Sequence, residues 1–431
     1  MILRKWSRIG IALTAAAGLV AVAGCTSGPS KENSSVKELS VMTRWLTGTP
    51  EGTIQAEVFA KFTKDTGVKI NVTQGGKELG DQLETATVAG KGPDIAIINL
   101  FNKSTQWLNA GLTVPVDQYV KDWGLDGKFQ DDALVQWRNG ATPSGKLQGF
   151  PYSGFTWPVW YNMSLLQKAG ITEIPATTDD LIADAQKLRA AGIGPLIVGG
   201  KDFSGQKLFY QIIQMYSTAK ESQKVMAKGG YCSTPDVMKG IELFTKLRDA
   251  GVFVDNSQGY SVDDMTSTFF AQKAAMMSAL SNNFGPAAKS GTDVVKNVKL
   301  GGFPLASGSS FSKPTEYKGF TGSGFMITKK GASSGHIELV KKLITAFMAK
   351  DVVGQFVTQA NNVTPLKADF SDAATDSLLK SSLSMDSGLD AAVLPDLWLG
   401  AAADPVTQST GLAFGKVSAS DICKSLDAAT K

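Results

Sequence analysis

The chain is poor in the residues on which many catalytic and metal sites depend. Among its 431 residues are one histidine, His336, and three cysteines, and no two cysteines form a Cys-x-x-Cys pair. Structural zinc sites use cysteine and histidine ligands, and a Ser–His–Asp hydrolase needs a histidine beside its nucleophile. We therefore expect no metal site, no cofactor and no histidine-based catalytic centre.

The chain also lacks a concentrated charge of either sign. Its 43 Lys and Arg residues nearly balance its 39 Asp and Glu residues, which gives a net charge of +4. Removing Arg4, Lys5 and Arg8 with the N-terminal segment leaves 40 basic and 39 acidic residues, a net charge of +1. Nucleic-acid binding requires a dense basic surface, so we expect no nucleic-acid partner.

Residues 1–24 have the pattern of an export signal. Basic residues precede an apolar run from Ile9 to Val22, and small residues follow it. A charged start, a short apolar centre and small residues at the end are typical of a cleaved signal peptide. The run is too short, and too closely followed by polar sequence, to predict a membrane-spanning helix.

The cysteine after this segment predicts a membrane anchor. Val22-Ala23-Gly24-Cys25 resembles the lipobox of bacterial lipoproteins, which implies cleavage before Cys25 and lipidation of its thiol. The alternative is an ordinary secretory signal with an incidental cysteine. Residues 25–36 are then a flexible tether rich in Ser, Gly and Lys. We expect an exported protein, held at the outer face of the cytoplasmic membrane by its lipid only.

Two cysteines remain once Cys25 carries lipid. Cys232 and Cys423 form an even pair in an oxidising compartment, which permits a disulfide between them. Two free thiols are the alternative. We predict the disulfide.

Residues 37–98 alternate between strand-like and helix-like patterns. The expected elements are a strand at Glu38–Thr43, a helix at Gly52–Asp65, a strand at Val68–Thr73, a helix at Leu79–Ala89 and a strand at Asp94–Ile98. Such alternation predicts a parallel sheet, in which ligands bind beyond the carboxyl ends of the strands. The length of the chain exceeds a single hydrophobic core and predicts two domains.

The stretch Phe150–Asn162 is unusually aromatic. It holds six aromatic residues, together with Pro151 and Pro158, which exclude an ordinary helix. One interpretation is a strand buried in the core. The other is that some of the rings line a cleft between two lobes, where flat apolar faces suit a sugar.

Several short blocks carry a family resemblance. In order along most of the chain, they resemble the extracellular solute-binding proteins of carbohydrate ABC importers, family 1, of which maltose-binding protein is the model. Each block is weak alone, and the ordered series is specific. The blocks are Gly92–Ile95 with Trp107–Leu112, Tyr161–Asn162 with Ala169–Ile171, Pro175–Leu181, Phe269–Met276 with Gln272 where the family has glycine, and Gly322–Ile327.

The resemblance implies a two-lobed α/β fold. Each lobe would be a mainly parallel sheet flanked by helices, and a hinge of several segments would join the lobes. One lobe would hold 37–145 and 297–350, and the other 146–296 and 351–431. The implied function is capture of a sugar or oligosaccharide between the lobes and delivery to an ABC permease, by a monomer that is no enzyme. The alternatives are an exported enzyme acting on glycans, or the same fold binding a non-sugar solute.

The candidate ligand-binding residues follow apolar runs or belong to the aromatic stretch. For each tryptophan, core packing is the alternative, and Trp398 resembles the late aromatic that the family places over a sugar ring. The candidates are Trp45, Asn99, Asn102, Phe155, Trp157, Asp202, Asn283, Phe284, Phe320 and Trp398.

One match to a catalytic motif does not support an enzyme. Residues 331–335 fit G-x-S-x-G between a strand and a helix, but the only histidine is the adjacent His336. Ser333 or Ser334 is better interpreted as the N-cap of a helix from His336 to Ala349. No motif singles out a pair of carboxylates for glycoside hydrolysis.

Overall fold

A computed structural model describes residues 36–76, 78–100, 103–281, 292–368, 370 and 388–431. Val36–Lys431 forms one compact unit. The predicted signal segment, Cys25, Asn102, Asn283 and Phe284 lie outside the described residues. Within the described part of the chain, no helix combines the length and the apolar character needed to cross a membrane.

The first sheet contains the predicted alternation of strands and helices. The strand β1 (Glu38–Thr43) pairs in parallel with β2 (Lys69–Gln74) and with β3 (Ile95–Ile98). The helices α1 (Pro50–Thr66) and α2 (Leu79–Val88) connect them. Thr49 caps α1 by accepting a hydrogen bond from the Gly52 amide, and the next residue is a proline, which suits the first turn.

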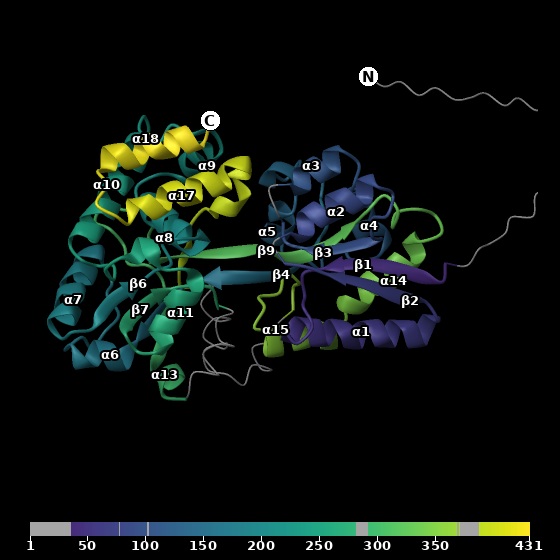
Figure 1. Cartoon of the computed structure of the whole chain (residues 1–431), viewed down its shortest axis with the longest axis horizontal. Coiled ribbons are helices and arrows are strands. Elements are labelled where there is room, and N and C mark those ends of the chain that lie inside the picture. Colours follow the sequence, from purple (N-terminus) through teal and green to yellow (C-terminus); the bar gives the residue numbers. More distant parts are fainter. Residues whose placement is uncertain (1–35, 77, 101–102, 282–291, 369, 371–387) are drawn as a thin grey trace, which may run out of the picture. The chain divides into compact units, whose positions relative to one another are not determined.

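Two long antiparallel strands extend this sheet. The strand β9 (Thr315–Ile327) pairs with β3 and with β4 (Phe150–Trp157), in a register that runs from Phe150 opposite Phe325 to Trp157 opposite Tyr317 (Figure 1). The short strand β10 (Asp390–Ala391) pairs with the start of β9. A Cβ atom on Gly154 would lie 2.5 Å from the Gly319 carbonyl oxygen, so a side chain there would force β4 and β9 apart.

The second sheet is mixed, in the order β6-β7-β5-β8. Its strands are β5 (Val159–Asn162), β6 (Gly194–Ile197), β7 (Ala274–Ser278) and β8 (Val298–Gly301). The pair β6–β7 is parallel, and β5 is antiparallel to both of its neighbours. The aromatic stretch is therefore two strands, β4 in the first sheet and β5 in the second, with Pro158 between them.

Helices cover both sheets. The structure contains α3 (Ser104–Asn109), α4 (Asp117–Asp122), α5 (Asp131–Gln136), α6 (Met163–Lys168), α7 (Thr178–Ala190), α8 (Phe203–Ile213), α9 (Ala219–Lys228), α10 (Pro235–Asp249), α11 (Val262–Phe270), α13 (Thr292–Asn297), α14 (Ile337–Phe347), α15 (Lys350–Ala360), α17 (Ala403–Ala413) and α18 (Ala419–Ala429). Thr177 and Asp180 form a capping box at the start of α7. The predicted serine cap of α14 is wrong. His336 occupies the N-cap position, and the Ser333 hydroxyl instead donates to the Lys330 carbonyl oxygen within the preceding turn.

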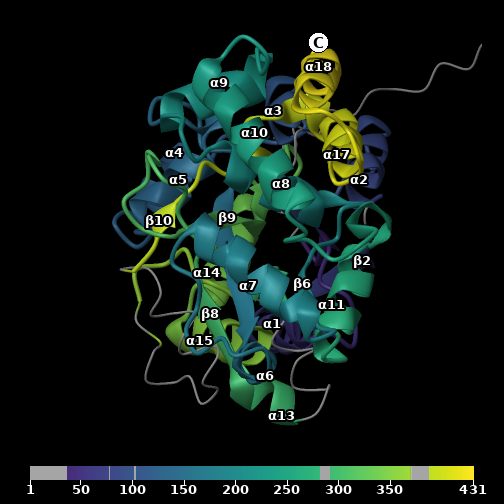
Figure 2. The same ribbon diagram turned by 90° about the vertical axis from the view of Figure 1, so that its left-hand side faces the viewer.

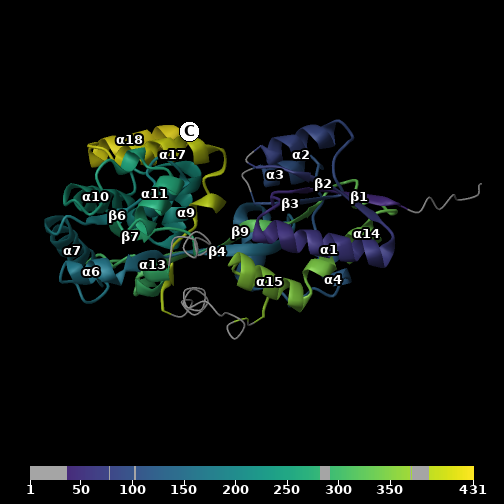
Figure 3. The same cartoon turned by 60° about the horizontal axis from the view of Figure 1, so that its bottom comes forward.

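The lobe boundaries stay a prediction, and three observations bear on where the chain crosses between lobes. The strand β4 belongs to the first sheet, and β8 belongs to the second. The helix α15 packs beside α1 (Figure 3), and its Phe356 lies in the same hydrophobic core as β1 and β3.

The predicted disulfide is present. It joins Cys232, in the loop before α10, to Cys423 in α18, with a Cα–Cα distance of 5.1 Å. The Asp427 carboxylate supports the same attachment, because it accepts hydrogen bonds from the amides of Gly230 (2.7 Å) and Tyr231 (2.8 Å). The last helix is thus tied to the second sheet's helical layer.

Candidate functional site

Two of the described candidate residues, Phe155 and Trp157, lie at the end of β4. We call Phe155, Trp157, Phe203, Lys207, Tyr317 and Asp396 the junction cluster, because these residues connect β4 and β9 with α8 and with the 3-10 helix Pro395–Leu397. Trp157 and Tyr317 are opposite each other on β4 and β9, and both are buried. Phe155 and Leu397 pack against the small apolar core that Trp157 and Tyr317 share with Ala392 and Leu394.

Trp157 links the first sheet to the second. Its indole N–H donates to the Ser278 hydroxyl at the end of β7 (3.0 Å), and the neighbouring Thr156 amide donates to the Ser281 hydroxyl (3.1 Å). The ring of Phe203 meets that of Trp157 edge to face, with centroids 6.0 Å apart. Phe203 is 43% exposed, which is high for an aromatic side chain with a buried partner. An accessible aromatic ring therefore borders a buried one.

Asp202 has a structural role in this arrangement. It is the N-cap of α8, where one carboxylate oxygen accepts from the Ser204 amide at 3.0 Å. The other oxygen accepts from the amide of Val262, the first residue of α11, at 2.7 Å. Both oxygens are engaged in holding helix starts, a favourable use of a carboxylate. The predicted role of Asp202 in ligand binding stays a prediction.

One face of α8 holds the segment that leads to Trp398. Lys207, Gln211 and Gln214 are spaced so that they share this face. Lys207 forms an ion pair with Asp396, and Gln211 donates to the Thr315 carbonyl oxygen at 2.6 Å. Gln214 exchanges two hydrogen bonds with the backbone of Val393, of 2.9 and 3.1 Å. The helix itself is packed against α10 and α17 (Figure 2), so these contacts start from a fixed element.

The electrostatics of the cluster centre on the Lys207–Asp396 pair. The Lys207 side chain is only 3% exposed, whereas that of Asp396 is 32% exposed. The Tyr317 hydroxyl donates to the Lys207 carbonyl oxygen at 2.9 Å. Burial, with the negative charge of Asp396 nearby, raises the pKa of Tyr317 well above its ordinary value. Tyr317 therefore stays a neutral hydrogen-bond donor.

The other described candidates lie at different distances from the cluster. Trp398 follows Asp396 by two residues, is half-buried and packs against the core of the second sheet. Phe320 is buried on β9, and its carbonyl oxygen accepts from the Trp137 indole at 2.6 Å. Asn99 is half-buried beside Leu100, whose amide donates to the Thr321 carbonyl oxygen at 3.2 Å. Asn99 and Phe320 thus lie near the middle of β9.

Trp45 lies elsewhere, inside the first sheet's core. It is 4% exposed, and the rings of Tyr152, Phe325, Phe347 and Phe356 surround it with centroid distances between 4.8 and 6.1 Å. This is the packing that the alternative interpretation of Trp45 describes. Its role in ligand binding stays a prediction.

Sequence reasoning did not select Phe203, Lys207 or Asp396. Phe203 directly follows the candidate Asp202, and Asp396 precedes Trp398 by two residues. No local sequence signal distinguishes them. The exposure of Phe203 and the ion pair between Lys207 and Asp396, which lie 189 residues apart in the chain, arise only when the chain folds.

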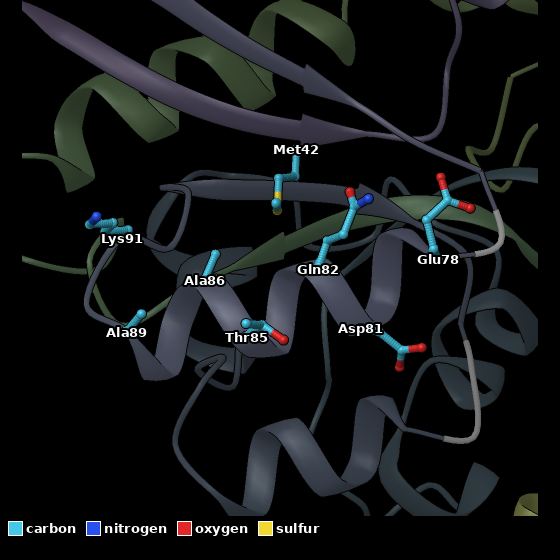
Figure 4. A pocket seen from close by; sticks show the side chains of 8 residues that line it. All are labelled: Met42, Glu78, Asp81, Gln82, Thr85, Ala86, Ala89 and Lys91. Atoms are coloured by element: carbon cyan, nitrogen blue, oxygen red, sulfur yellow. The ribbon is translucent and has the colours of Figure 1, made fainter.

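Two hollows lie away from the candidates. One, of about 490 Å³, lies between β1 and α2, where Met42 points toward Gln82 and Ala86 (Figure 4). The other, of about 200 Å³, lies beside α7 and α10 and includes Lys239, whose Nζ is 3.9 Å from the Tyr216 ring centroid. In the part of the chain that the structure describes, no three His, Cys, Asp or Glu side chains gather as a metal site would require.

Comparisons with known proteins agree with this architecture. Residues 47–354 match the model of the bacterial extracellular solute-binding protein family. The structure of a probable secreted solute-binding lipoprotein from Streptomyces coelicolor is similar at a TM-score of 0.82 and 36% identity, over 92% of this chain and 99% of that one.

Curated relatives match over shorter regions. A putative binding protein of Brucella abortus is 29% identical over 46% of this chain and 47% of its own length. An alpha-glucosides-binding periplasmic protein of Rhizobium meliloti is 29% identical over 33% of this chain and 31% of its own length. The chain spans about half the length, or less, of these curated relatives. The family match over residues 47–354 shows that the chain belongs to the bacterial extracellular solute-binding proteins.

Proposed function

We propose that the protein captures a neutral sugar or oligosaccharide outside the cytoplasm and delivers it to an ABC permease. The observation that carries this proposal is the junction cluster, where the accessible ring of Phe203 meets Trp157 and where Lys207, one turn later on α8, balances the charge of the Asp396 carboxylate. Aromatic faces and hydrogen-bond acceptors without net charge suit a ligand with apolar faces and hydroxyl edges. The alpha-glucosides-binding relative supports a carbohydrate.

The proposed mechanism is conformational and makes or breaks no bond. A ligand at the junction would contact residues of both sheets, because β4 and β9 meet β7 and α8 there. Contacts made only when the lobes are close shift the population toward a closed form, which the permease would recognise. For the lobes we propose the predicted segments, with β4 and α15 moved to the first lobe and β8 to the second.

A thermal-shift panel tests the ligand class. The soluble form without residues 1–25 is heated with maltotriose, raffinose, xylotriose or triacetylchitotriose. A sugar that binds only the folded protein raises the melting temperature, and a concentration of 100 Kd adds about 2.7 kcal/mol to the free energy of unfolding. We expect at least one sugar to do so. No shift with any of the four at millimolar concentration would contradict this ligand class.

The same mixtures separate a binding protein from an enzyme. After long incubation, chromatography should recover each sugar unchanged. A new product that forms in proportion to protein concentration would favour the glycan-acting enzyme instead.

We also propose that Cys25 carries the lipid anchor. The support is the lipobox-like Val22-Ala23-Gly24-Cys25 after a signal-like segment. Cys25→Ser should move the protein from the membrane fraction to the soluble fraction, whereas the neighbouring Thr26→Ala should leave it on the membrane. Continued membrane association of the Cys25→Ser protein would refute the anchor.

A further inference from the structure

The Lys207–Asp396 pair has its base inside the protein and its acid at the surface. The ammonium group of Lys207 lies in the interior, and roughly a third of the Asp396 side chain is accessible. A buried ammonium group is costly without a partner, so Lys207 requires the carboxylate to stay in place. The pair therefore fixes Asp396 in one orientation.

Only one oxygen of Asp396 is occupied by this pair. Oδ1 accepts from Lys207 Nζ, and among the described residues no group donates to Oδ2. The backbone around Asp396 is also held, because Pro395 is buried and Gln214 binds Val393. Asp396 thus presents an oriented oxygen that no other described residue satisfies.

An accessible aromatic ring lies on the helix that holds Asp396 in place. Phe203 lies one turn before Lys207 on α8 and, as described above, exposes its ring beside Trp157. A carboxylate only accepts hydrogen bonds, and its oxygens can take two donors at once. Because Lys207 balances its charge, a cationic ligand would bring an unbalanced charge into a partly buried site, whereas hydroxyl groups would not.

We propose that Asp396 accepts hydrogen bonds from ligand hydroxyl groups and that Lys207 is its positioning residue, so that this pair selects a neutral polyhydroxylated ligand. The inference rests on the proposed function and names the polar contact of that same site.

The test measures binding of the panel sugar that shifts the wild-type melting temperature most, by isothermal titration. Hydrogen bonds to a charged group are strong enough that Asp396→Asn should weaken binding about ten- to a hundredfold. Asp404→Asn, the same charge change at an exposed position of α17, should leave Kd within twofold. The Asp396→Asn protein leaves the buried charge of Lys207 without its partner, which can impair folding. The double variant Lys207→Met with Asp396→Asn removes that charge too, so it tests the loss of the Asp396 carboxylate in a protein without an unpaired buried charge.

A double-mutant cycle tests the positioning role. Lys207→Met should weaken binding about five- to tenfold in the wild-type background and have little further effect once Asp396 is asparagine, because its effect passes through that carboxylate. Wild-type affinity in either Asp396→Asn protein would overturn the inference and leave the proposed function standing. Equal effects of Lys207→Met in both backgrounds would overturn the positioning role. No binding of any panel sugar by the wild type would overturn both proposals.

Discussion

Two regions of the molecule each contain a buried tryptophan and an ion pair with one buried partner. In the first region the buried partner of the ion pair is the acid, and in the second it is the base. In the first sheet, every ring neighbour of Trp45 is a core residue, and beside the start of β1 the acid Asp94 is fully buried while its partner Lys330 is half-exposed. In the junction cluster Trp157 is equally buried, but its neighbour Phe203 is exposed, and the acid rather than the base reaches the surface. Burial of a tryptophan is therefore common to both regions, and the exposure of its neighbours is what distinguishes the junction cluster that we propose as the site.

The charged groups make the same distinction. The Oδ2 atom of Asp94 has only internal partners, since it accepts from the Ser40 amide (2.7 Å) and hydroxyl (2.9 Å), and Lys330 Nζ lies 3.2 Å away. His336 Nδ1 lies 2.8 Å from its other oxygen. Asp396 has one internal partner and an accessible oxygen. The first acid is closed off from solvent, whereas the second is partly accessible.

The largest expected effect is that of Trp45→Ala. Removing a large ring from a closed core should lower the free energy of unfolding by about 3–5 kcal/mol. Chemical denaturation measures this, and titration of the folded protein with the best panel sugar should give an unchanged Kd. Binding weakened tenfold or more with unchanged stability would instead make Trp45 a ligand residue, as first predicted.

Removal of the disulfide should weaken the attachment of α18 to the loop before α10 and leave the junction cluster unchanged. Cys232→Ser combined with Cys423→Ser should lower the free energy of unfolding by about 2–4 kcal/mol, because the unfolded chain gains freedom. The sugar Kd should change less than twofold. Before mutation, the denatured, unreduced soluble form should show no free thiol; two titratable thiols would disprove the disulfide.

Asp94→Asn should destabilise the first region by a smaller amount. The amide keeps the shape of the side chain but replaces one acceptor with a donor, which leaves a donor of Ser40 or Lys330 without its acceptor. A loss of about 1–3 kcal/mol is expected in denaturation. Binding should be unaffected, and a weakened sugar Kd in a fully folded variant would contradict the separation of the two regions.

Phe203→Ala should have the smallest effect on stability and a clear one on binding. Its ring is already half in solvent, so unfolding should change by less than about 1 kcal/mol. Loss of an aromatic contact with a sugar should weaken binding about five- to tenfold. The control is Leu412→Ala, which shortens an exposed apolar side chain of a different helix, α17. It should change neither the free energy of unfolding nor the sugar Kd. Equal sugar affinity in the two variants would remove Phe203 from the site.

Much of the fold could be predicted from local sequence. The alternation over residues 37–98, the capping box of Thr177 and Asp180, and the ordered blocks of the family each depend on nearby residues, and the structure confirms them. The disulfide was suggested by counting, because two cysteines remain once Cys25 is assigned to the lipid, and the structure shows the bond. The predicted serine cap of α14 is wrong. Ser333 and Ser334 are suited to capping and lie close to the start of the helix, but His336 occupies the N-cap position.

The site depended on tertiary structure. Trp45 and Trp157 look alike in sequence, since each sits at the end of a strand among apolar residues, and only packing gives one a cage of rings and the other an exposed neighbour. Asp202 was selected as a polar loop residue and is a helix cap, while Lys207 and Asp396 meet across 189 residues of chain. Local patterns predict helices and strands because the spacing of apolar residues along the chain decides which face each element can bury. Burial and long-range pairing are set by which surfaces meet, and that is decided only when the whole chain packs.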